Sequence, residues 1–401
     1  MFPAISAVST HEVLTWKNSK FIQGKKMLNR KTSLKNVLGS AVAATLLMGA
    51  ASFAQANVAV PGGIVTQAGI AGSIVTPLIT SGALPDSPAA HVDANVATSK
   101  FSGVVSINIR YMVGDAQQSF ICSGALVGKR QVISAGHCVD TDGNGHIVDI
   151  NAPGNDVRVI FNSTASGAGS AVVTANKVSM NADYAGFNIC PDTTLGCVND
   201  DVSVITLSQD APASAKIYKV AVNPLLSGTH IIMAGYGTSG DGVNGYYVSP
   251  SFRVKRSGEN YADLFDGNDE LNFGGLNEVF YADFDGAGKD TFCNNYGVCS
   301  PVLPNDRESG IGGGDSGGPS FVEMYGELML VANNTFSGRF SNQVAGTFGT
   351  YFGGIIMSGY TDYLLAATDG NITFVPEPTS VALLGLGSLM LLGARRRRSA
   401  K

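Results

Sequence analysis

The sequence predicts an all-β fold. From Phe101 onward, short runs rich in β-branched and aromatic residues alternate with turns of Gly, Asn and Asp. Long helical periods are nearly absent, and the one helix-like stretch, residues 360–367, lies near the C-terminal end. The clearest strands are the runs at 104–111, 123–127, 131–134, 157–162, 202–207, 230–234, 328–333 and 346–352.

The first hundred residues divide into three segments. Residues 27–56 have the pattern of a secretory signal peptide, with a basic start, an apolar core of small residues and Ala54-Gln55-Ala56 as a cleavage site. A transmembrane anchor is the alternative, but the core is short and rich in Gly and Ala. Residues 1–26 are then an over-extended N-terminus. Residues 57–100 are rich in Gly, Ala, Val and Pro, which is typical of a linker or pro-segment.

The C-terminal segment, residues 371–401, has three parts in sequence. Val375-Pro376-Glu377-Pro378 precedes an apolar run at 381–393 and four arginines at 395–398. This arrangement resembles a PEP-CTERM sorting signal of Gram-negative bacteria. Such a run is a transient membrane segment stopped by arginines that stay inside. The resemblance implies an exosortase-type sorting peptidase as a partner, and localisation to the cell envelope or extracellular matrix. An ordinary tail anchor is the alternative, but the run is short for a full span.

The charge of the remaining chain argues against nucleic acid as a partner. Residues 37–370 carry 14 basic and 29 acidic side chains, a formal charge of −15. Proteins that bind nucleic acid present a basic face, which this composition does not supply. An acidic body is soluble and self-repelling, and we expect a monomer.

A glycine-rich turn presents a serine in the last third of the chain. The stretch is Gly312-Gly313-Gly314-Asp315-Ser316-Gly317-Gly318-Pro319. Glycines let the backbone bend where a Cβ would clash, so main-chain N–H groups can converge beside the hydroxyl. Converging N–H groups beside a nucleophile form an oxyanion hole, here from Gly314 and Ser316. A merely flexible glycine loop is the alternative.

A serine nucleophile needs a base, and the base needs a carboxylate that orients it. Of the five histidines, His137 follows a β-rich run and a turn of small residues, which places its imidazole at a strand end. Asp201 directly precedes the apolar strand 202–207 and is the better carboxylate candidate. Asp200 is adjacent, but the apolar pattern begins after Asp201.

These residues and their neighbours resemble the trypsin/chymotrypsin family of serine proteases. The matching motifs, in order, are Cys122–Val127, Ala135-Gly136-His137-Cys138, Ala234-Gly235-Tyr236-Gly237, Gly314–Pro319 and the cleft-lining strand Asn334-Thr335-Phe336-Ser337. The resemblance implies a protease domain over residues 101–370. It also implies two six-stranded antiparallel β-barrels, the active site in the cleft between them, and a short C-terminal helix.

The resemblance further implies a serine endopeptidase that acts on protein or peptide through an acyl-enzyme and needs no cofactor. His137, Asp201 and Ser316 would be the catalytic residues. The place where trypsin-like enzymes keep an aspartate at the floor of the specificity pocket is Gly310, so cleavage after basic residues is not expected. The other pocket residues would be Thr335, Ser337 and Gly349, and this pocket favours small or apolar side chains.

One family feature is not recognisable in the sequence. Many members are activated by cleavage before an Ile-Val-Gly-Gly sequence, and the new N-terminus pairs with the aspartate before the serine, here Asp315. The sequence has no Arg-Ile-Val-Gly-Gly, so either Asp315 has another partner or the processing differs from that of the family.

The six cysteines predict three disulfides, because their number is even and the chain is exported. Cys122–Cys138 matches the family bridge beside the histidine. Cys190–Cys197 and Cys293–Cys299 would close small loops, and those pairings rest on proximity alone. A zinc site is the alternative, but no histidine accompanies either pair.

Two acidic loops have some likeness to calcium sites. Asp140, Asp142 and Asn144 have the spacing of a calcium loop with glycine in the sixth place, but Asn151 stands where the twelfth-place glutamate should be. The loop at 283–288, with two aspartates, is a weaker match. Solvated turns are the preferred interpretation of both loops.

Two other classes of function use the same residues. An esterase would pass through the same oxyanion chemistry. A binding protein of the envelope or matrix would keep the fold without turnover, although the intact set of His137, Asp201 and Ser316 argues against it.

Overall fold

The computed structural model describes residues 72–75, 79–164, 169–194, 196–340 and 342–376. All of them fall within one unit of the chain. The predicted over-extended N-terminus and signal peptide lie outside the described residues. So do the apolar run and the arginines of the predicted sorting signal.

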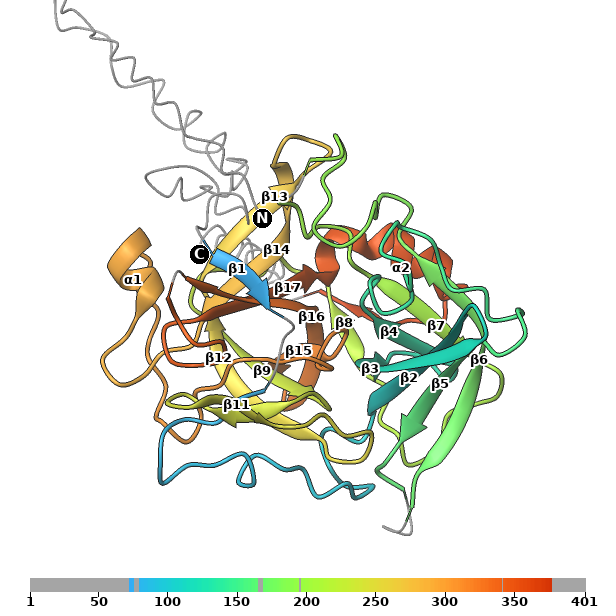
Figure 1. The fold of residues 1–401 in the computed structure, drawn as a ribbon, viewed down its shortest axis with the longest axis horizontal. Helices are drawn as coiled ribbons and strands as arrows, with labels where there is room; N and C mark the ends of the chain where they lie inside the picture. Colours follow the sequence, from blue (N-terminus) through green and yellow to red (C-terminus); the bar gives the residue numbers. More distant parts are fainter. Residues whose placement is uncertain (1–71, 76–78, 165–168, 195, 341, 377–401) are drawn as a thin grey trace, which may run out of the picture. The chain divides into compact units, whose positions relative to one another are not determined.

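The first half of the domain is a closed barrel of six antiparallel strands in the order β2-β3-β4-β7-β6-β5 (Figure 1). Inward-facing valines and isoleucines, such as Val157 and Val159, alternate with half-buried residues along the strands and fill the barrel. The strands are β2 (Val104–Val113), β3 (Ala116–Leu126), β4 (Gln131–Ser134), β5 (Asp156–Phe161), β6 (Ala171–Met180) and β7 (Ser203–Leu207).

The second half is a ten-stranded sheet, which is consistent with the expected second barrel. Its main path runs β12-β9-β15-β16-β17-β14-β13, and β1, β8 and β18 pair off this path. The strands are β1 (Gly72–Val75), β8 (Lys219–Ala221), β9 (Thr229–Gly235), β12 (Arg256–Ala262), β13 (Leu264–Asn268), β14 (Gly274–Asp283), β15 (Pro319–Met324), β16 (Glu327–Phe340), β17 (Tyr351–Ile356) and β18 (Phe374–Val375). A separate hairpin joins β10 (Ser239–Asp241) to β11 (Gly245–Val248).

Helices are few, as the sequence predicts. They are α1 (Thr291–Tyr296), the 3-10 turn η1 (Met357–Tyr360) and α2 (Thr361–Ala367), the last being the expected C-terminal helix. Among the described residues, no helix is both long and apolar enough to cross a membrane. The all-β prediction is confirmed.

One apolar cluster joins the two halves. It includes Val104 and Val204 from the barrel together with Phe321 and Ile355 from the second sheet. A polar contact supports the same junction, because the buried Asn333 side chain donates to the carbonyls of both Ser134 and Asp201. The facing strand ends of the two halves are therefore held in a fixed relation, and the candidate site lies there.

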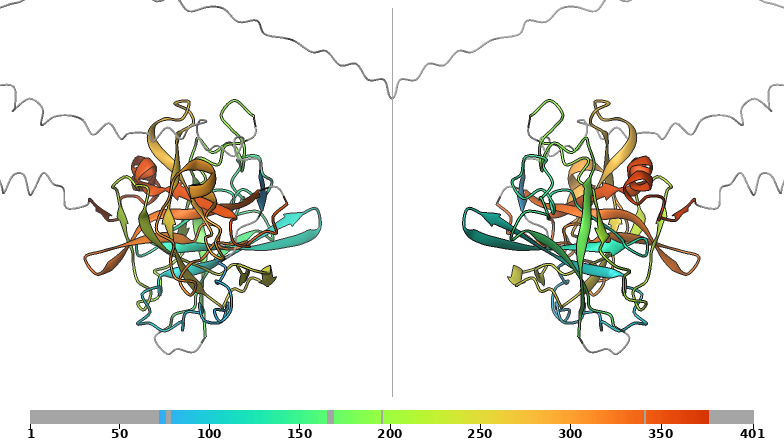
Figure 2. Two further views of the ribbon diagram at one scale, coloured as in Figure 1. Left: turned by 90° about the vertical axis from the view of Figure 1, so that its left-hand side faces the viewer. Right: turned by 90° about the vertical axis from the view of Figure 1, so that its right-hand side faces the viewer.

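Residues 79–100, which we expected within a linker or pro-segment, are described and lie against the second sheet. This segment is blue to cyan in Figure 1 and stays along one side of the domain in both views of Figure 2. Ile79 is buried in an apolar cluster of that sheet. Thr80 N–H donates to the Gly310 carbonyl, and Asp93 N–H to the Lys255 carbonyl.

Candidate active site

His137 lies in the turn that follows β4, and both carboxylate oxygens of Asp201 bind it. Its backbone N–H donates to Asp201 Oδ1 at 2.7 Å, and its ring Nδ1 lies 2.7 Å from Asp201 Oδ2. The Cys122–Cys138 disulfide ties the same turn to β3. The carboxylate therefore fixes the ring orientation through Nδ1 and leaves Nε2 as the nitrogen that Asp201 does not engage.

Asp201 and Asp200 have different environments, although both are buried. Asp201, fully buried, binds His137. Asp200 has a positive φ of 63° and turns its side chain toward Asn181, whose amide donates to it at 2.7 Å. Burial, helped by the charges of nearby acidic side chains, raises the pKa of Asp200 to about 9. Only Asp201 is therefore placed to stabilise an imidazolium.

The Ser316 turn meets the histidine turn at the Cys122–Cys138 disulfide. Cys138 Sγ lies 4.0 Å from His137 Nε2 and 3.7 Å from the Ser316 carbonyl oxygen. The Ser123 N–H donates to the same carbonyl at 2.8 Å. Three segments far apart in sequence thus converge on the serine, which is 3% exposed.

Two glycines in this turn have conformations that other residues rarely adopt. Gly314 has φ +99°, and its carbonyl is turned away to accept from the Ser123 hydroxyl at 2.7 Å. A Cβ on Gly317 would lie 2.1 Å from Ser134 Oγ. Within the described part of the chain, neither the Gly314 N–H nor the Ser316 N–H donates to a protein acceptor.

Asp315 is fully buried directly before the serine and accepts three backbone hydrogen bonds. The donors are Gly237 at 2.8 Å, Gly312 at 3.0 Å and Ile79 at 2.5 Å. Burial raises the pKa of Asp315 to about 7, although the Gly237 and Ile79 hydrogen bonds and the charge of Arg256 oppose this.

Ile79 is a partner of Asp315 that the sequence analysis missed. Its stretch, Ile79-Thr80-Ser81-Gly82, keeps the first and fourth residues of Ile-Val-Gly-Gly. The preceding arginine and the two central residues of the family pattern are not present in it. The isoleucine, the glycine and the distance to the histidine motif were the available signal.

The four predicted pocket residues come from three segments of the second half of the domain. Gly310 is buried, and its N–H and carbonyl both bind Thr80. Thr335 and Ser337 lie on β16 and are buried. Gly349 donates to the Phe284 carbonyl at 2.7 Å.

A short strand covers the edge of β16 beside these residues. β1 pairs antiparallel with β16, and Val75 stands opposite Ser337 while Gly72 stands opposite Phe340. The chain thus runs along β16 toward Thr335, on the strand that resembles the family's cleft-lining strand.

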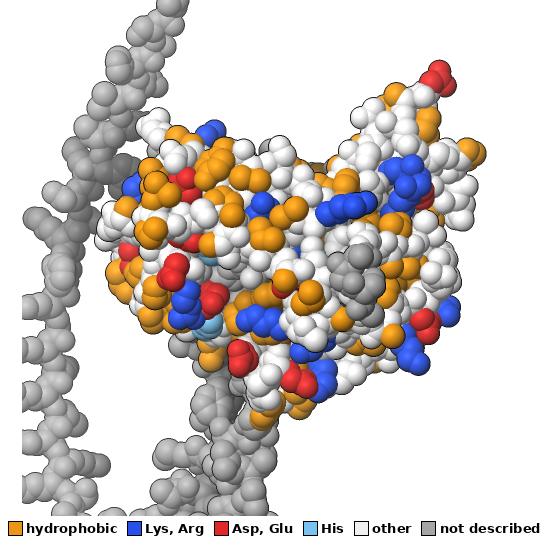
Figure 3. Space-filling model, turned by 90° about the horizontal axis from the view of Figure 1, so that it is seen from below, with side chains coloured by type: hydrophobic (Ala, Val, Ile, Leu, Met, Phe, Trp, Pro, Cys, Tyr) orange, Lys and Arg blue, Asp and Glu red, His pale blue; other side chains and the backbone are white. Residues whose placement is uncertain are grey.

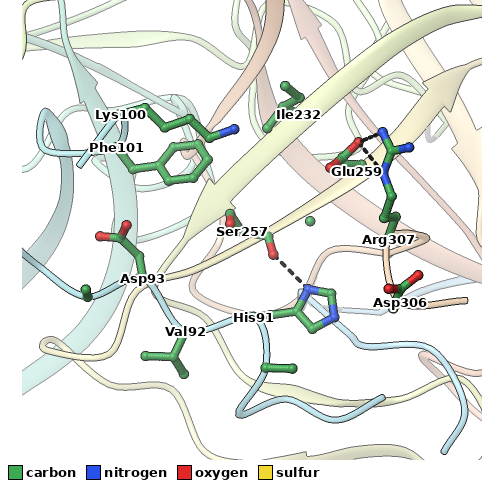
Figure 4. A pocket seen from close by; sticks show the side chains of 13 residues that line it. His91, Val92, Asp93, Lys100, Phe101, Ile232, Ser257, Glu259, Asp306 and Arg307 are labelled. Atoms are coloured by element: carbon green, nitrogen blue, oxygen red, sulfur yellow. Dashed lines mark hydrogen bonds and ion pairs between the residues drawn. The ribbon is translucent and has the colours of Figure 1, made fainter. Parts of the chain in front are cut away.

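A polar pocket of about 340 Å³ lies elsewhere and includes none of the predicted site residues. Figure 4 shows His91 bound to the Ser257 carbonyl on one side and Arg307 paired with Glu259 on the other. On the face seen in Figure 3, basic and acidic side chains are interspersed among apolar and neutral ones.

The three disulfides pair as predicted: Cys122–Cys138, Cys190–Cys197 and Cys293–Cys299. All six sulfurs are therefore engaged in bridges rather than available to zinc.

In the first acidic loop, backbone N–H groups of the loop itself bind the Asp140 carboxylate. Asp140 Oδ1 accepts from the N–H groups of Gly143 and Asn144, and Oδ2 accepts from Gly145 at 2.9 Å. Asp142 accepts from the Asn144 side chain at 2.8 Å. These hydrogen bonds close the loop as a turn.

Comparison with protein families identifies two parts of the chain. A model of the trypsin family matches residues 100–253, and a model of the PEP-CTERM protein-sorting motif matches residues 374–398. The chain carries a trypsin-family domain and a PEP-CTERM sorting motif. No curated protein matches the chain.

These matches imply a serine protease that acts on protein. They also imply sorting by an exosortase and export to the cell envelope of a Gram-negative bacterium.

Proposed function

We propose that the chain is an exported serine endopeptidase that hydrolyses peptide bonds through His137, Asp201 and Ser316. The observation that carries the proposal is the pair of contacts between the Asp201 carboxylate and His137, one to the backbone N–H and one to ring Nδ1, at 2.7 Å each. The histidine turn lies next to the glycine-rich turn that holds Ser316. Such a His–Asp pair sets the imidazole tautomer that accepts a serine proton.

The proposed reaction has two halves. His137 takes the proton of Ser316 as the hydroxyl attacks the carbonyl carbon, and returns it to the leaving amine. The N–H groups of Gly314 and Ser316 stabilise the oxyanion, at roughly 3 kcal/mol per donor. Water then attacks the acyl-enzyme, with His137 as the base again. No cofactor takes part in these steps.

The proposed specificity is for small or apolar side chains. Gly310 supplies no charge where trypsin-like enzymes keep a carboxylate, and Ser337 and Gly349 are small. A peptide library scored by the residue before the cut tests this proposal. Cleavage mainly after Lys or Arg would contradict it.

We further propose that residues 57–78 form a pro-segment of the exported protein. The β1 pairing supports this, because its backbone takes the edge of β16 that an extended substrate would use. The mature protein acts as a monomer in the cell envelope or extracellular matrix after exosortase sorting and transient membrane association.

The first test is labelling with a fluorophosphonate, which reacts with an activated serine. The parent should be labelled and Ser316→Ala should not. Ser119→Ala is the matched control, since Ser119 is exposed on β3 in the barrel, and it should be labelled like the parent. Labelling of Ser316→Ala would disprove the nucleophile.

An esterase is the second candidate and shares the whole site. Parallel assays on matched ester and amide substrates separate the two functions. A protease should cleave both, whereas an esterase should cleave the ester alone. A labelled chain that hydrolyses neither substrate supports the third candidate, a binding protein without turnover.

A further inference from the structure

A cluster of carboxylates lies where β14 ends and the chain turns toward α1. Asp283, Asp285 and Asp290 each direct one carboxylate oxygen into it, and these oxygens all lie within 4.8 Å of one another. Two more acidic side chains border it, since Asp263 accepts from Asp283 N–H and Glu308 accepts from Asp285 N–H.

Most of the cluster is buried, and Asp290 is half-buried. Asp283 is 3% exposed, Asp285 7% and Glu308 2%. Asp283 accepts from two backbone N–H groups through Oδ2. Asp285 Oδ1 is buried and, among the described residues, has no hydrogen-bond partner. A buried carboxylate oxygen without a donor is costly, so a ligand is the expected partner.

The charges in the cluster have one sign. The side chains that act electrostatically on Asp285, those of Asp283, Glu308, Asp290 and Asp263, are all acidic. The nearest basic residue in sequence is Lys289, and its ammonium group donates to the Phe348 carbonyl at 3.0 Å.

We propose that Asp283, Asp285 and Asp290 bind a calcium ion, with Asp263 and Glu308 beside them. The donors are all oxygen, which favours Ca²⁺ or Mg²⁺ over metals that prefer nitrogen or sulfur. Ca²⁺ accepts six to eight oxygens in irregular geometry, whereas Mg²⁺ demands a near-ideal octahedron and keeps its waters. Carboxylates contributed by separate segments fit the first behaviour.

The site adjoins the proposed specificity pocket. Phe284, between two of the aspartates, donates to the Thr350 carbonyl at 2.8 Å and accepts from Gly349. Glu308 stands two residues before Gly310. Calcium would therefore order one wall and the floor of the pocket. This coupling rests on the proposed function, whereas the binding itself does not.

The alternative is a cluster without metal, in which neighbouring carboxyls share protons. The two cases differ in the effect of one substitution. Without metal, Asp285→Asn replaces a carboxyl that shares protons with its neighbours by a neutral amide, so the melting temperature is the same in calcium and in chelator. With metal, the same change removes a ligand and lowers the melting temperature in calcium, while it stays neutral or stabilising in chelator.

The experiment measures thermal unfolding of the purified full chain in EGTA, in about 10 mM MgCl₂ and in about 10 mM CaCl₂, with calcium titration calorimetry beside it. A dissociation constant of about 10⁻⁴ M, as in extracellular calcium modules, predicts a rise of about 5 °C in calcium. Magnesium should give a smaller rise.

The variants are Asp285→Asn and Asp290→Asn, each of which should lose the calcium shift. Asparagine at 290 can still cap α1, so that variant should fold even if the first does not. Asp142→Asn, in the other acidic loop, is the matched control and should keep the shift. A calcium shift that survives in both cluster variants overturns the proposal. So does a shift that Asp142→Asn abolishes, and so does the absence of a shift in the parent.

The measurement also separates the binding from the proposed function. The calcium shift should be the same in Ser316→Ala, which has no nucleophile. In the parent, calcium should lower KM for peptide while the rate of labelling at Ser316 changes less. A calcium shift in a chain without peptidase activity would keep the site and reject only the function.

Discussion

The backbone N–H of Ile79 donates a 2.5 Å hydrogen bond to the buried carboxylate of Asp315. This contact joins the start of the segment 79–164 to the residue that precedes the proposed nucleophile, 236 positions further along the chain. Cleavage of the Leu78–Ile79 bond would place a positive α-amino group at the position of this N–H. The neutral hydrogen bond would then become a buried ion pair.

We therefore predict that a chain beginning at Ile79 is more active than one beginning at Asn57. An ammonium group on Asp315 would hold the Gly312–Ser316 turn, and with it both oxyanion donors, in one conformation. Breaking such a buried pair costs about 3–5 kcal/mol. N-terminal sequencing of the exported protein and the fluorophosphonate labelling rate of both forms measure this. Equal labelling rates would show that the uncut turn is already in its active conformation.

Asp315 should also make the stability of the uncut chain depend on pH. Burial raises its pKa from 3.8 to about 7 in the folded chain, so folding favours the protonated form. This contribution is fully present below about pH 4 and is lost as the pH rises through about 7, by up to about 4 kcal/mol. Urea unfolding of the parent and Asp315→Asn at several pH values measures it. The difference between the two chains should change over that window, and a constant difference would contradict the prediction.

Asp201→Asn should lower kcat by about 10⁴-fold, because the amide no longer sets the tautomer of His137. Asp200→Asn is the matched control on the neighbouring residue. Burial raises the pKa of Asp200 to about 9, so it is mainly protonated at pH 7 and an amide resembles it. Its kcat should remain that of the parent. An equal loss in both variants would mean that the effect comes from the loop and not from the contact with His137.

The parts of the site that depend on neighbouring residues could be predicted from the sequence. His137 and Ser316 each sit in a motif of consecutive residues, and Asp201 directly precedes an apolar strand. Two of the disulfides followed from small separations along the chain, and Cys122–Cys138 followed from the family resemblance. Each of these signals depends on neighbours in sequence, so no knowledge of the tertiary fold was needed to read it.

The parts that the sequence did not predict depend on distant segments. Ile79 matters only because the fold brings it to Asp315. The calcium cluster combines Asp263, the loop after β14 and Glu308, and its significance lies in burial, which spacing alone does not reveal. Strand β12, with the sequence Arg-Ser-Gly-Glu-Asn-Tyr-Ala, has few β-branched residues and owes its conformation to pairing with β9.

The β1 strand provides the last prediction. Because β1 takes the edge of β16 at Ser337, it competes with an extended substrate for the same backbone groups. Successive N–H groups of an antiparallel strand point to opposite sides, so one of the N–H groups of residues 74 and 75 faces β16. Proline has no N–H, so prolines at both positions remove the hydrogen bond that this group donates to β16.

The double variant Ile74→Pro/Val75→Pro should therefore lower KM for peptide several-fold with kcat unchanged, since only occupancy of the cleft is altered. The chain offers a matched control in Ile64-Val65, which has the same two residues ten positions earlier and the same following threonine. Ile64→Pro/Val65→Pro should leave KM as in the parent, measured on the uncut chain with the same peptide. An equal fall in both double variants would show that any loosening of the pro-segment suffices. An unchanged KM in the first would mean that β1 does not compete with substrate.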